Sequence, residues 1–319
     1  MKKDELIEAF RRMCTIREFE DSIHTNNALG NIPGFIHLCA GQEASAVGVC
    51  WNLNRNDYIT STHRGHGHSI AKGCDVKAMM HEIYAKKTGI CAGKGGSMHI
   101  ADLDKGMLGA NGIVGGGVPL GCGAALAAKL KANNAVGLSF FGDGAFNEGA
   151  TMETMNLARV LNLPMIFVLE NNGYGEATPA SFAIGGEISK RVEGFGIPYS
   201  HADGHDFFAV EAVASKAIEA ARNGDGPQFI ELETYRYYGH FEGDAAGYRA
   251  KGEAEAVKKS NDCLDNFRKT VSAKKTVSKK EFDRISAEIK QFIKDCVVDA
   301  EAAPTPTADD LLTDVYTRY

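Results

Sequence analysis

Two polar clusters, each placed directly after an apolar run, carry the residue types best suited to chemistry. One is GDG at 142–144 and the other is ENN at 170–172. Asp143 and Asn172 offer the oxygen ligands that Mg²⁺ prefers, and the glycines beside Asp143 let the backbone approach a bulky ligand closely. A carboxylate repels phosphate unless a cation lies between them. These clusters therefore predict Mg²⁺ bound together with a diphosphate.

The pattern around these clusters predicts the elements that position them. An apolar strand precedes each cluster, and a helical pattern at 149–162 lies between them. A strand–helix–strand unit places two parallel strands side by side, with their carboxyl ends at the edge where open α/β sheets bind ligands. We therefore expect Asp143 and Asn172 to be adjacent in space, although 29 residues separate them. Taken singly, Asp143 would also suit a helix N-cap and Asn172 a turn.

A third candidate site is the segment 61–68, STHRGHGH, which contains three histidines and one arginine. Imidazole is the commonest metal ligand, but these spacings fit no standard zinc motif, and Arg64 would repel a cation. A guanidinium that grips phosphate oxygens through paired hydrogen bonds fits better. We therefore expect His63 and Arg64 to bind an anion, with structural histidines and a metal site as the alternatives.

Strands alternate with helices through the middle of the chain, which predicts a doubly wound, mostly parallel α/β sheet flanked by helices. From about residue 252 the pattern changes to Lys/Glu-rich helices. We expect 1–319 to form one domain, with a core of about 30–250 and a helical C-terminal extension of about 252–319. The expected elements are helices at 3–28, 41–53, 75–87, 121–131 and 207–222, and strands at 58–60, 195–198 and 226–232.

The glycine-rich stretch 89–117 is predicted to be an ordered loop that faces a ligand, because Met, Ile and Val are interspersed in it. It contains no GxxxxGK[ST] motif, and 142–144 lacks the third glycine of a GxGxxG fingerprint. A nucleotide-dependent phosphotransferase is therefore disfavoured.

Composition excludes other classes of function. The 319 residues carry 35 Lys+Arg against 41 Asp+Glu, a net charge of -6 that argues against a nucleic-acid partner. No apolar run reaches the roughly 18 residues that a membrane span needs, and the N-terminus lacks the apolar segment of a signal peptide. The 8 cysteines are scattered without a CxxC pair. We expect free thiols and a cytoplasmic protein.

Several motifs together identify a family. GKGGSMH (93–99), NGIVGGGVPLG (111–121), GDGAFNEG (142–149), ENNGYG (170–175) and YRYYGH (235–240) are present, with about 26 residues between GDG and NN. They resemble the α subunit of the first component of thiamin-diphosphate-dependent 2-oxo acid dehydrogenases. The resemblance covers about residues 5–315. Within that family, 61–73 and 239–249 are most similar to acetoin dehydrogenase α subunits.

The resemblance implies thiamin diphosphate and Mg²⁺ as cofactors and assigns a role to each matching residue. The implied metal ligands are the side chains of Asp143 and Asn172 and the backbone carbonyl of Tyr174. The positions at the diphosphate are His63, Arg64, Gly144, Ala145 and His240, and those at the aminopyrimidine are Gly112 and Val114. The implied catalytic residues are His37, His240 and His63. One departure is Tyr238, where the family usually has another histidine.

The resemblance also implies an activity: cleavage of acetoin, release of acetaldehyde and transfer of an acetyl unit to a lipoyl-bearing acyltransferase. Pyruvate or a branched-chain 2-oxo acid is the alternative small carbonyl substrate, and a non-catalytic paralogue of the same fold is a further alternative. The pyrimidine-binding half and its activating glutamate are expected on a separate β subunit, in an α2β2 assembly. Residues 241–244 replace the phosphorylatable serines of mitochondrial pyruvate enzymes, so kinase control at that position is not expected.

Overall fold

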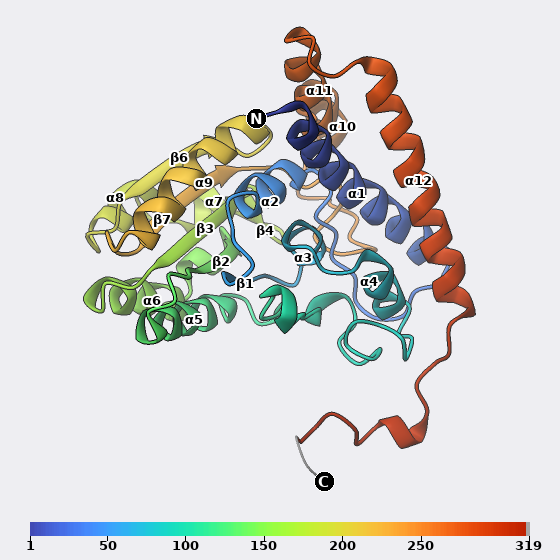
Figure 1. Cartoon of the computed structure of the whole chain (residues 1–319), viewed down its shortest axis with the longest axis horizontal. Coiled ribbons are helices and arrows are strands. Elements are labelled where there is room, and N and C mark those ends of the chain that lie inside the picture. The colour runs from blue at the N-terminus through green and yellow to red at the C-terminus, as the bar shows by residue number, and fades with distance from the viewer. Residues whose placement is uncertain (317–319) are drawn as a thin grey trace.

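A five-stranded sheet forms the centre of the chain in the computed structural model, which describes residues 1–316 (Figure 1). The strand order is β1-β2-β3-β7-β6, and every neighbouring pair is parallel. This arrangement confirms the predicted α/β fold with a parallel sheet. The strands are β1 (Tyr58–Thr60), β2 (Gly137–Gly142), β3 (Met165–Asn171), β6 (Tyr199–Asp203) and β7 (Gln228–Glu233).

Side chains alternate between the two faces of the sheet, and each face has its own hydrophobic core. On β3, Ile166 and Val168 belong to one core, whereas Phe167 and Leu169 belong to the other. Helices α2, α3 and α9 contribute to the first core or pack beside it, and α5, α6 and α8 contribute to the second, so the sheet is doubly wound. These helices are α2 (Glu43–Cys50), α3 (His66–Lys72), α5 (Gly117–Lys131), α6 (Gly149–Val160), α8 (Ile188–Glu193) and α9 (Phe207–Arg222).

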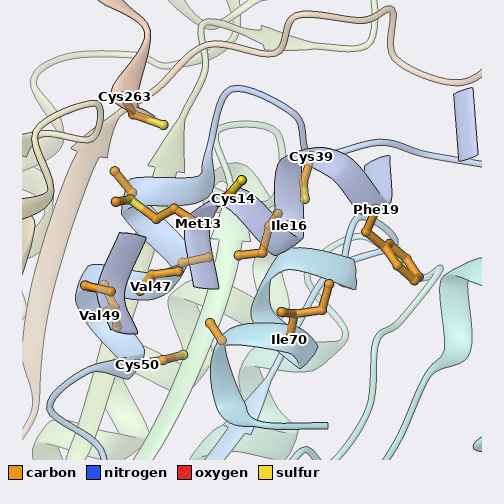
Figure 2. Packing of buried hydrophobic residues seen from close by; sticks show 14 of the residues in the cluster. Met13, Cys14, Ile16, Phe19, Cys39, Val47, Val49, Cys50, Ile70 and Cys263 are labelled. Atoms are coloured by element: carbon orange, nitrogen blue, oxygen red, sulfur yellow. The ribbon is translucent and has the colours of Figure 1, made fainter. Parts of the chain in front are cut away.

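The first and last long helices, α1 and α12, lie side by side, and their buried residues belong to the first core (Figure 1). Phe10 of α1 contacts Phe267 and Phe282, with ring centroids 6.1 and 4.6 Å away. Figure 2 shows Met13 and Ile16 of the same helix within the buried cluster. This outer layer comprises α1 (Lys3–Ala28), α4 (Val76–Ile83), α10 (Glu253–Asn261), α11 (Cys263–Ala273) and α12 (Lys279–Ala302).

A buried cluster of three charged side chains joins α1, α2 and α11. The Arg17 guanidinium lies 2.6 Å from Glu43 on α2 and 2.8 Å from Asp262, the residue that caps α11. All three side chains are buried, and the two carboxylates supply the charge that a buried guanidinium needs. The contact therefore ties the C-terminal helices to the start of the chain.

Several expected elements have other bounds in the structure: the helix expected at 121–131 is α5, which begins at Gly117, and those expected at 41–53 and 226–232 are α2 and β7. The predicted strand at 195–198 is wrong, because the strand is β6, which begins at Tyr199 after Pro198, a residue without a backbone N–H. It is an edge strand with a polar sequence, so it has no apolar run to mark it. The helix expected to end near residue 87 ends at Ile83, and Ala85 adopts a left-handed φ of 51°.

The glycine-rich loop after α4 is ordered around one carboxylate. Glu82, which is fully buried, accepts hydrogen bonds from the backbone N–H groups of Cys91, Gly93, Gly95 and Gly96, at 2.8–2.9 Å. Four donors on one carboxylate satisfy its acceptor capacity without a cation. The loop then leads through Ser97, whose hydroxyl bonds His66, toward the predicted aminopyrimidine positions.

The remaining elements are short and lie in loops. They are the antiparallel pair β4 (Tyr174–Gly175) and β5 (Thr178–Pro179), α7 (Ala180–Ala183), and 3-10 turns at Ser97–His99, Leu103–Lys105, Ala145–Asn147 and Ala308–Asp310. Within residues 1–316, every helix is too short or too polar to cross a bilayer.

Candidate functional site

A cavity of about 300 Å³ opens at the carboxyl ends of β1, β2 and β3. Three segments at these strand ends line the cavity. They are residues 61–64 after β1, residues 142–145 at the end of β2, and Asn172 after β3. The register pairs Gly142 with Glu170, which brings the two polar clusters side by side. Parallel strands thus bring Asp143 and Asn172 to one edge of the sheet, as the sequence predicted, and residues 61–64 lie at the same edge.

Asp143 is the acidic group of this cavity. Its side chain is only 3% exposed, and burial raises the pKa of its carboxyl above the ordinary value. Within residues 1–316 the side chains of other residues neither donate a hydrogen bond to its carboxyl group nor form an ion pair with it, and Asn147 donates only to its backbone carbonyl, at 3.4 Å. A buried carboxylate that forms no ion pair, although Arg236 and Arg64 lie near enough to lower its pKa, suits a metal ion, which would favour its ionised form further.

Asn172 and Tyr174 stand beside Asp143 on the cavity wall. The Asn172 amide nitrogen donates to the side-chain oxygen of Gln42 at 3.2 Å, and its amide oxygen accepts from the Tyr174 N–H at 3.4 Å. Gly173 between them has φ +84°, a left-handed conformation that suits glycine in this turn. Carboxylate, amide and carbonyl oxygens together form the donor set that Mg²⁺ takes.

A cluster of imidazoles and guanidiniums adjoins the same cavity. Ring nitrogens of His37, His63 and His240 all lie within 4.8 Å of one another. The Arg64 guanidinium is 3.5 Å from the His63 ring and 3.3 Å from the His240 ring, and it donates to the His240 backbone carbonyl at 2.8 Å. Because Arg64 is buried among these rings, the positive charge of the cluster suits an anion better than a cation.

A second arginine reinforces this charge. Arg236, one of the largest fully buried side chains, places Nη1 3.1 Å from Nδ1 of His240, while its Nε and Nη2 have no hydrogen-bond partner among the described residues. Burial, followed by the neighbouring charge of Arg236, lowers the pKa of Arg64 to about 9. Two buried cations and unpaired guanidinium nitrogens leave a demand for negative charge.

The same environment holds the histidines neutral. Burial, followed by the Arg64 charge, lowers the pKa of His37 to about 4, of His63 to about 2 and of His240 to about 3. Two guanidiniums face Nδ1 of His240, which assigns that nitrogen as an acceptor and places the ring proton on Nε2. His240 therefore presents a neutral N–H away from the arginines.

The other predicted residues fall into two groups. Val114 lines the cavity and is 48% exposed, beside Ile113, which is 73% exposed. Gly144 and Ala145 form the wall after Asp143, where small side chains leave room for a ligand. Two residues do not line the cavity: Gly112 lies next to its wall, and His37 contacts the rings of His63 and His240 from behind.

Three residues of the site were missed in the sequence. Gln42 and Glu170 line the cavity floor, and Arg236 stands behind His240. Gln42 follows a glycine in a turn 130 residues from Asn172, and only the fold brings them together. Glu170 belongs to the ENN motif and Arg236 to YRYYGH, so their motifs were recognised without their individual contacts.

The cavity fits a diphosphate with a divalent cation. Oxygen donors gather at Asp143 and Asn172, guanidinium and imidazole donors gather at Arg64 and His240, and residues 142–145 fill little of the space between. The unpartnered nitrogens of Arg236 and the buried Asp143 carboxyl call for ligands of opposite charge on the two sides.

The fold and the site define an α/β enzyme that binds a phosphorylated cofactor at the carboxyl ends of parallel strands. Residues 11–309 match the family described as the dehydrogenase E1 component. The chain belongs to this family of thiamin-diphosphate-dependent oxidoreductases.

Relatives extend over the whole chain. The α subunit of an acetoin:2,6-dichlorophenolindophenol oxidoreductase from Cupriavidus necator is 53% identical over 100% of this chain and 96% of its own length. Its counterpart from Bacillus subtilis is 53% identical over 97% of this chain and 93% of its own length. A pyruvate dehydrogenase E1 component α subunit from Zymomonas mobilis is 40% identical over 98% of this chain and 89% of its own length.

Proposed function

We propose that this chain is the α subunit of a thiamin-diphosphate-dependent acetoin dehydrogenase. The observation that carries the proposal is the paired site at the strand ends, with oxygen donors at Asp143 and Asn172 opposite the cations Arg64 and Arg236. The acetoin assignment is supported by two relatives that are 53% identical, against 40% for the pyruvate dehydrogenase relative.

In this proposal Mg²⁺ is held by the Asp143 and Asn172 side chains and the Tyr174 carbonyl. The diphosphate lies along Gly144 and Ala145 and contacts His63, Arg64 and His240. Val114 and Gly112 adjoin the aminopyrimidine end. When bound, thiamin diphosphate supplies the carbanion that cleaves the carbon–carbon bond next to a carbonyl.

The chain's own contribution is proton handling. Cleavage of acetoin requires loss of the hydroxyl proton as acetaldehyde leaves, and a neutral His37 or His240 is suited to accept it. A diphosphate would offset the Arg64 charge that depresses both pKa values, and would bring them back toward the ordinary value near 6.5. The Nε2–H of His240 is free to donate to the carbonyl oxygen as negative charge develops there.

The balanced reaction needs an acceptor of two electrons. Acetoin and a lipoyl disulfide give acetaldehyde and an S-acetyl dihydrolipoyl group, so the disulfide is reduced while the two-carbon unit is oxidised. The lipoyl group belongs to a partner acyltransferase.

Two phenylalanines border the histidine cluster. The exposed Phe35 has its ring centroid 4.7 Å from that of His37, and the adjoining Phe241 suits the methyl groups of acetoin.

A β subunit completes the proposed site. Exposed apolar side chains lie at the cavity and on α5: Ile113 is 73% exposed, Leu120 54% and Leu130 78%. Large apolar residues exposed in one region favour a protein interface. We propose that this face contacts the β subunit in an α2β2 assembly, and that the β subunit supplies the activating glutamate. The eight free thiols suit the reducing cytoplasm, where we place the assembly.

The test is reconstitution with a β subunit of this enzyme family from the same organism. Dye reduction would be measured with acetoin, pyruvate and a branched-chain 2-oxo acid, each with thiamin diphosphate and Mg²⁺. We expect no activity from either chain alone, and a kcat/KM for acetoin at least about tenfold above that for the 2-oxo acids. Activity of this chain alone would refute the shared site. A preference for pyruvate would favour the pyruvate dehydrogenase alternative. An assembly without activity towards any of these substrates would favour a non-catalytic paralogue.

A further inference from the structure

A buried glutamine connects two residues of the cavity floor. Gln42 is 3% exposed and lies immediately before α2, with its backbone held by hydrogen bonds to Cys39 and Ala46. Its side-chain Nε2 donates to Glu170 at 3.1 Å, and its Oε1 accepts from Nδ2 of Asn172 at 3.2 Å. Both atoms of the amide are therefore engaged, each by a different side of the cavity floor.

Glu170 is held rigidly from the other side. The Ser45 hydroxyl donates to its Oε1, and Nε2 of His68 lies 3.3 Å from the same oxygen. The His68 ring stacks on Phe140 with centroids 3.7 Å apart, and its Nδ1 bonds the Ser61 hydroxyl at 2.7 Å. Every member of this chain of contacts is buried, so the carboxylate has one defined place.

These contacts fix the direction of the Asn172 amide. A carboxylate only accepts hydrogen bonds, so Glu170 requires the NH₂ end of Gln42 to face it. The oxygen of Gln42 must then face Asn172, and an oxygen requires the NH₂ end of Asn172. The Asn172 oxygen is consequently turned the other way, toward the Tyr174 N–H and the loop beside Asp143.

We propose that Gln42 is a positioning residue that, held by Glu170, directs the Asn172 oxygen to a divalent cation. The inference rests on the proposed function, because it takes Asn172 as a metal ligand. Without Gln42 only the long 3.4 Å hydrogen bond from the Tyr174 N–H would orient the amide, so it would more often present its NH₂ end, which cannot bind a cation. Loss of such a partner of a metal ligand typically weakens metal affinity by about 10–100-fold.

The test measures metal affinity directly in the assembly with the β subunit. Mn²⁺ replaces Mg²⁺ as the probe, and free Mn²⁺ is followed by electron paramagnetic resonance during titration in the presence of thiamin diphosphate. Gln42→Met keeps the length of the side chain and removes both hydrogen bonds. We expect its Mn²⁺ Kd to rise about 10–100-fold over the wild type.

Gln228→Met is the matched control. Gln228 is another buried glutamine, at the amino end of β7 and away from the cavity, where its amide bonds the Gly226 carbonyl. It should lose stability in the same way without a change in Mn²⁺ Kd. If Gln42→Met does not fold, Glu170→Gln tests the same chain, because an amide at that position no longer dictates which end of Gln42 faces it.

The outcomes separate the two levels of the proposal. A folded Gln42→Met or Glu170→Gln protein with wild-type Mn²⁺ affinity overturns the inference while leaving the metal site intact. Equal weakening by Gln42→Met and Gln228→Met also overturns it, since the effect would then be general destabilisation. Absence of Mn²⁺ binding by the wild type refutes the proposed metal site itself.

Discussion

Acid should destabilise the cofactor-free protein through the histidine cluster. The pKa values of about 4 for His37, about 2 for His63 and about 3 for His240 lie below the value near 6.5 of an unfolded histidine. As the pH falls from 7.5 to 5, the unfolded chain takes up protons at these rings and the folded chain does not. Stability is therefore present above pH 6.5 and is lost progressively below it.

The magnitude follows from the same shifts. Each ring that stays neutral in the folded state lowers the free energy of unfolding at pH 5 by about 2 kcal/mol relative to pH 7.5. His37 is buried, whereas His63 and His240 are half-buried and screened by solvent, so we assign about 2 kcal/mol to the first and about 1 to each of the others. The cluster should thus contribute a loss of about 4 kcal/mol.

Urea unfolding at pH 7.5 and pH 5 measures this loss. His63→Gln should remove about 1 kcal/mol of the pH dependence, because glutamine does not titrate. His201→Gln is the control, since His201 is exposed at the sheet edge, beside Glu233. An identical pH dependence in His63→Gln and wild type, or a wild type that is more stable at pH 5, would refute the reasoning.

Three further predictions concern the ligands of the site and the loop beside it. Thiamin diphosphate should offset the Arg64 charge and raise the histidine pKa values, so calorimetry near pH 5.5 in buffers of different ionisation enthalpy should detect proton uptake on binding; no uptake contradicts this. Asp143→Asn should weaken Mg²⁺-dependent cofactor binding by about 100-fold or more. Its cofactor-free stability should not fall, because the variant removes a carboxyl whose pKa is raised by burial. Glu82→Gln should cost about 2–3 kcal/mol in urea unfolding and open the loop to trypsin at Lys94, because a neutral amide cannot accept four N–H groups. Unchanged stability and cleavage would show that the carboxylate is not what orders the loop.

The sequence was most informative where chemistry and periodicity coincide. The expected strand at 58–60 and helix at 207–222 match β1 and α9 residue for residue, and Asp143 and Asn172 line one cavity as their placement after strands predicted. Apolar runs that end in glycine and polar residues leave few alternative structures. The same clarity was missing at β6, because the residues of an edge strand do not need to be apolar.

The residues that sequence analysis missed depend on tertiary contacts. Gln42 has no local feature that separates it from a surface glutamine, and its role comes from Glu170 and Asn172 on another segment. Arg236 is a charged residue in an aromatic motif, and only the fold shows it to be buried against His240. Spacing along the chain cannot report such contacts, since they join positions more than a hundred residues apart or depend on burial. The cofactor, metal and catalytic roles assigned to the site residues, Gly112 and Tyr174 among them, all stay predictions.

The contact of α1 with the C-terminal helices has a consequence for biosynthesis. Phe10 is made early but packs on Phe267 and Phe282, so 272 residues separate it from its last aromatic partner. At about 5–20 residues per second, roughly 15–55 s pass between the synthesis of the two ends of this contact. During that time the part of the α1 apolar face that packs on α11 and α12 stays uncovered, although α2 and α3 are already available to cover the rest. Nascent chains of this protein are therefore most exposed to aggregation, and most in need of chaperones, until translation is almost complete.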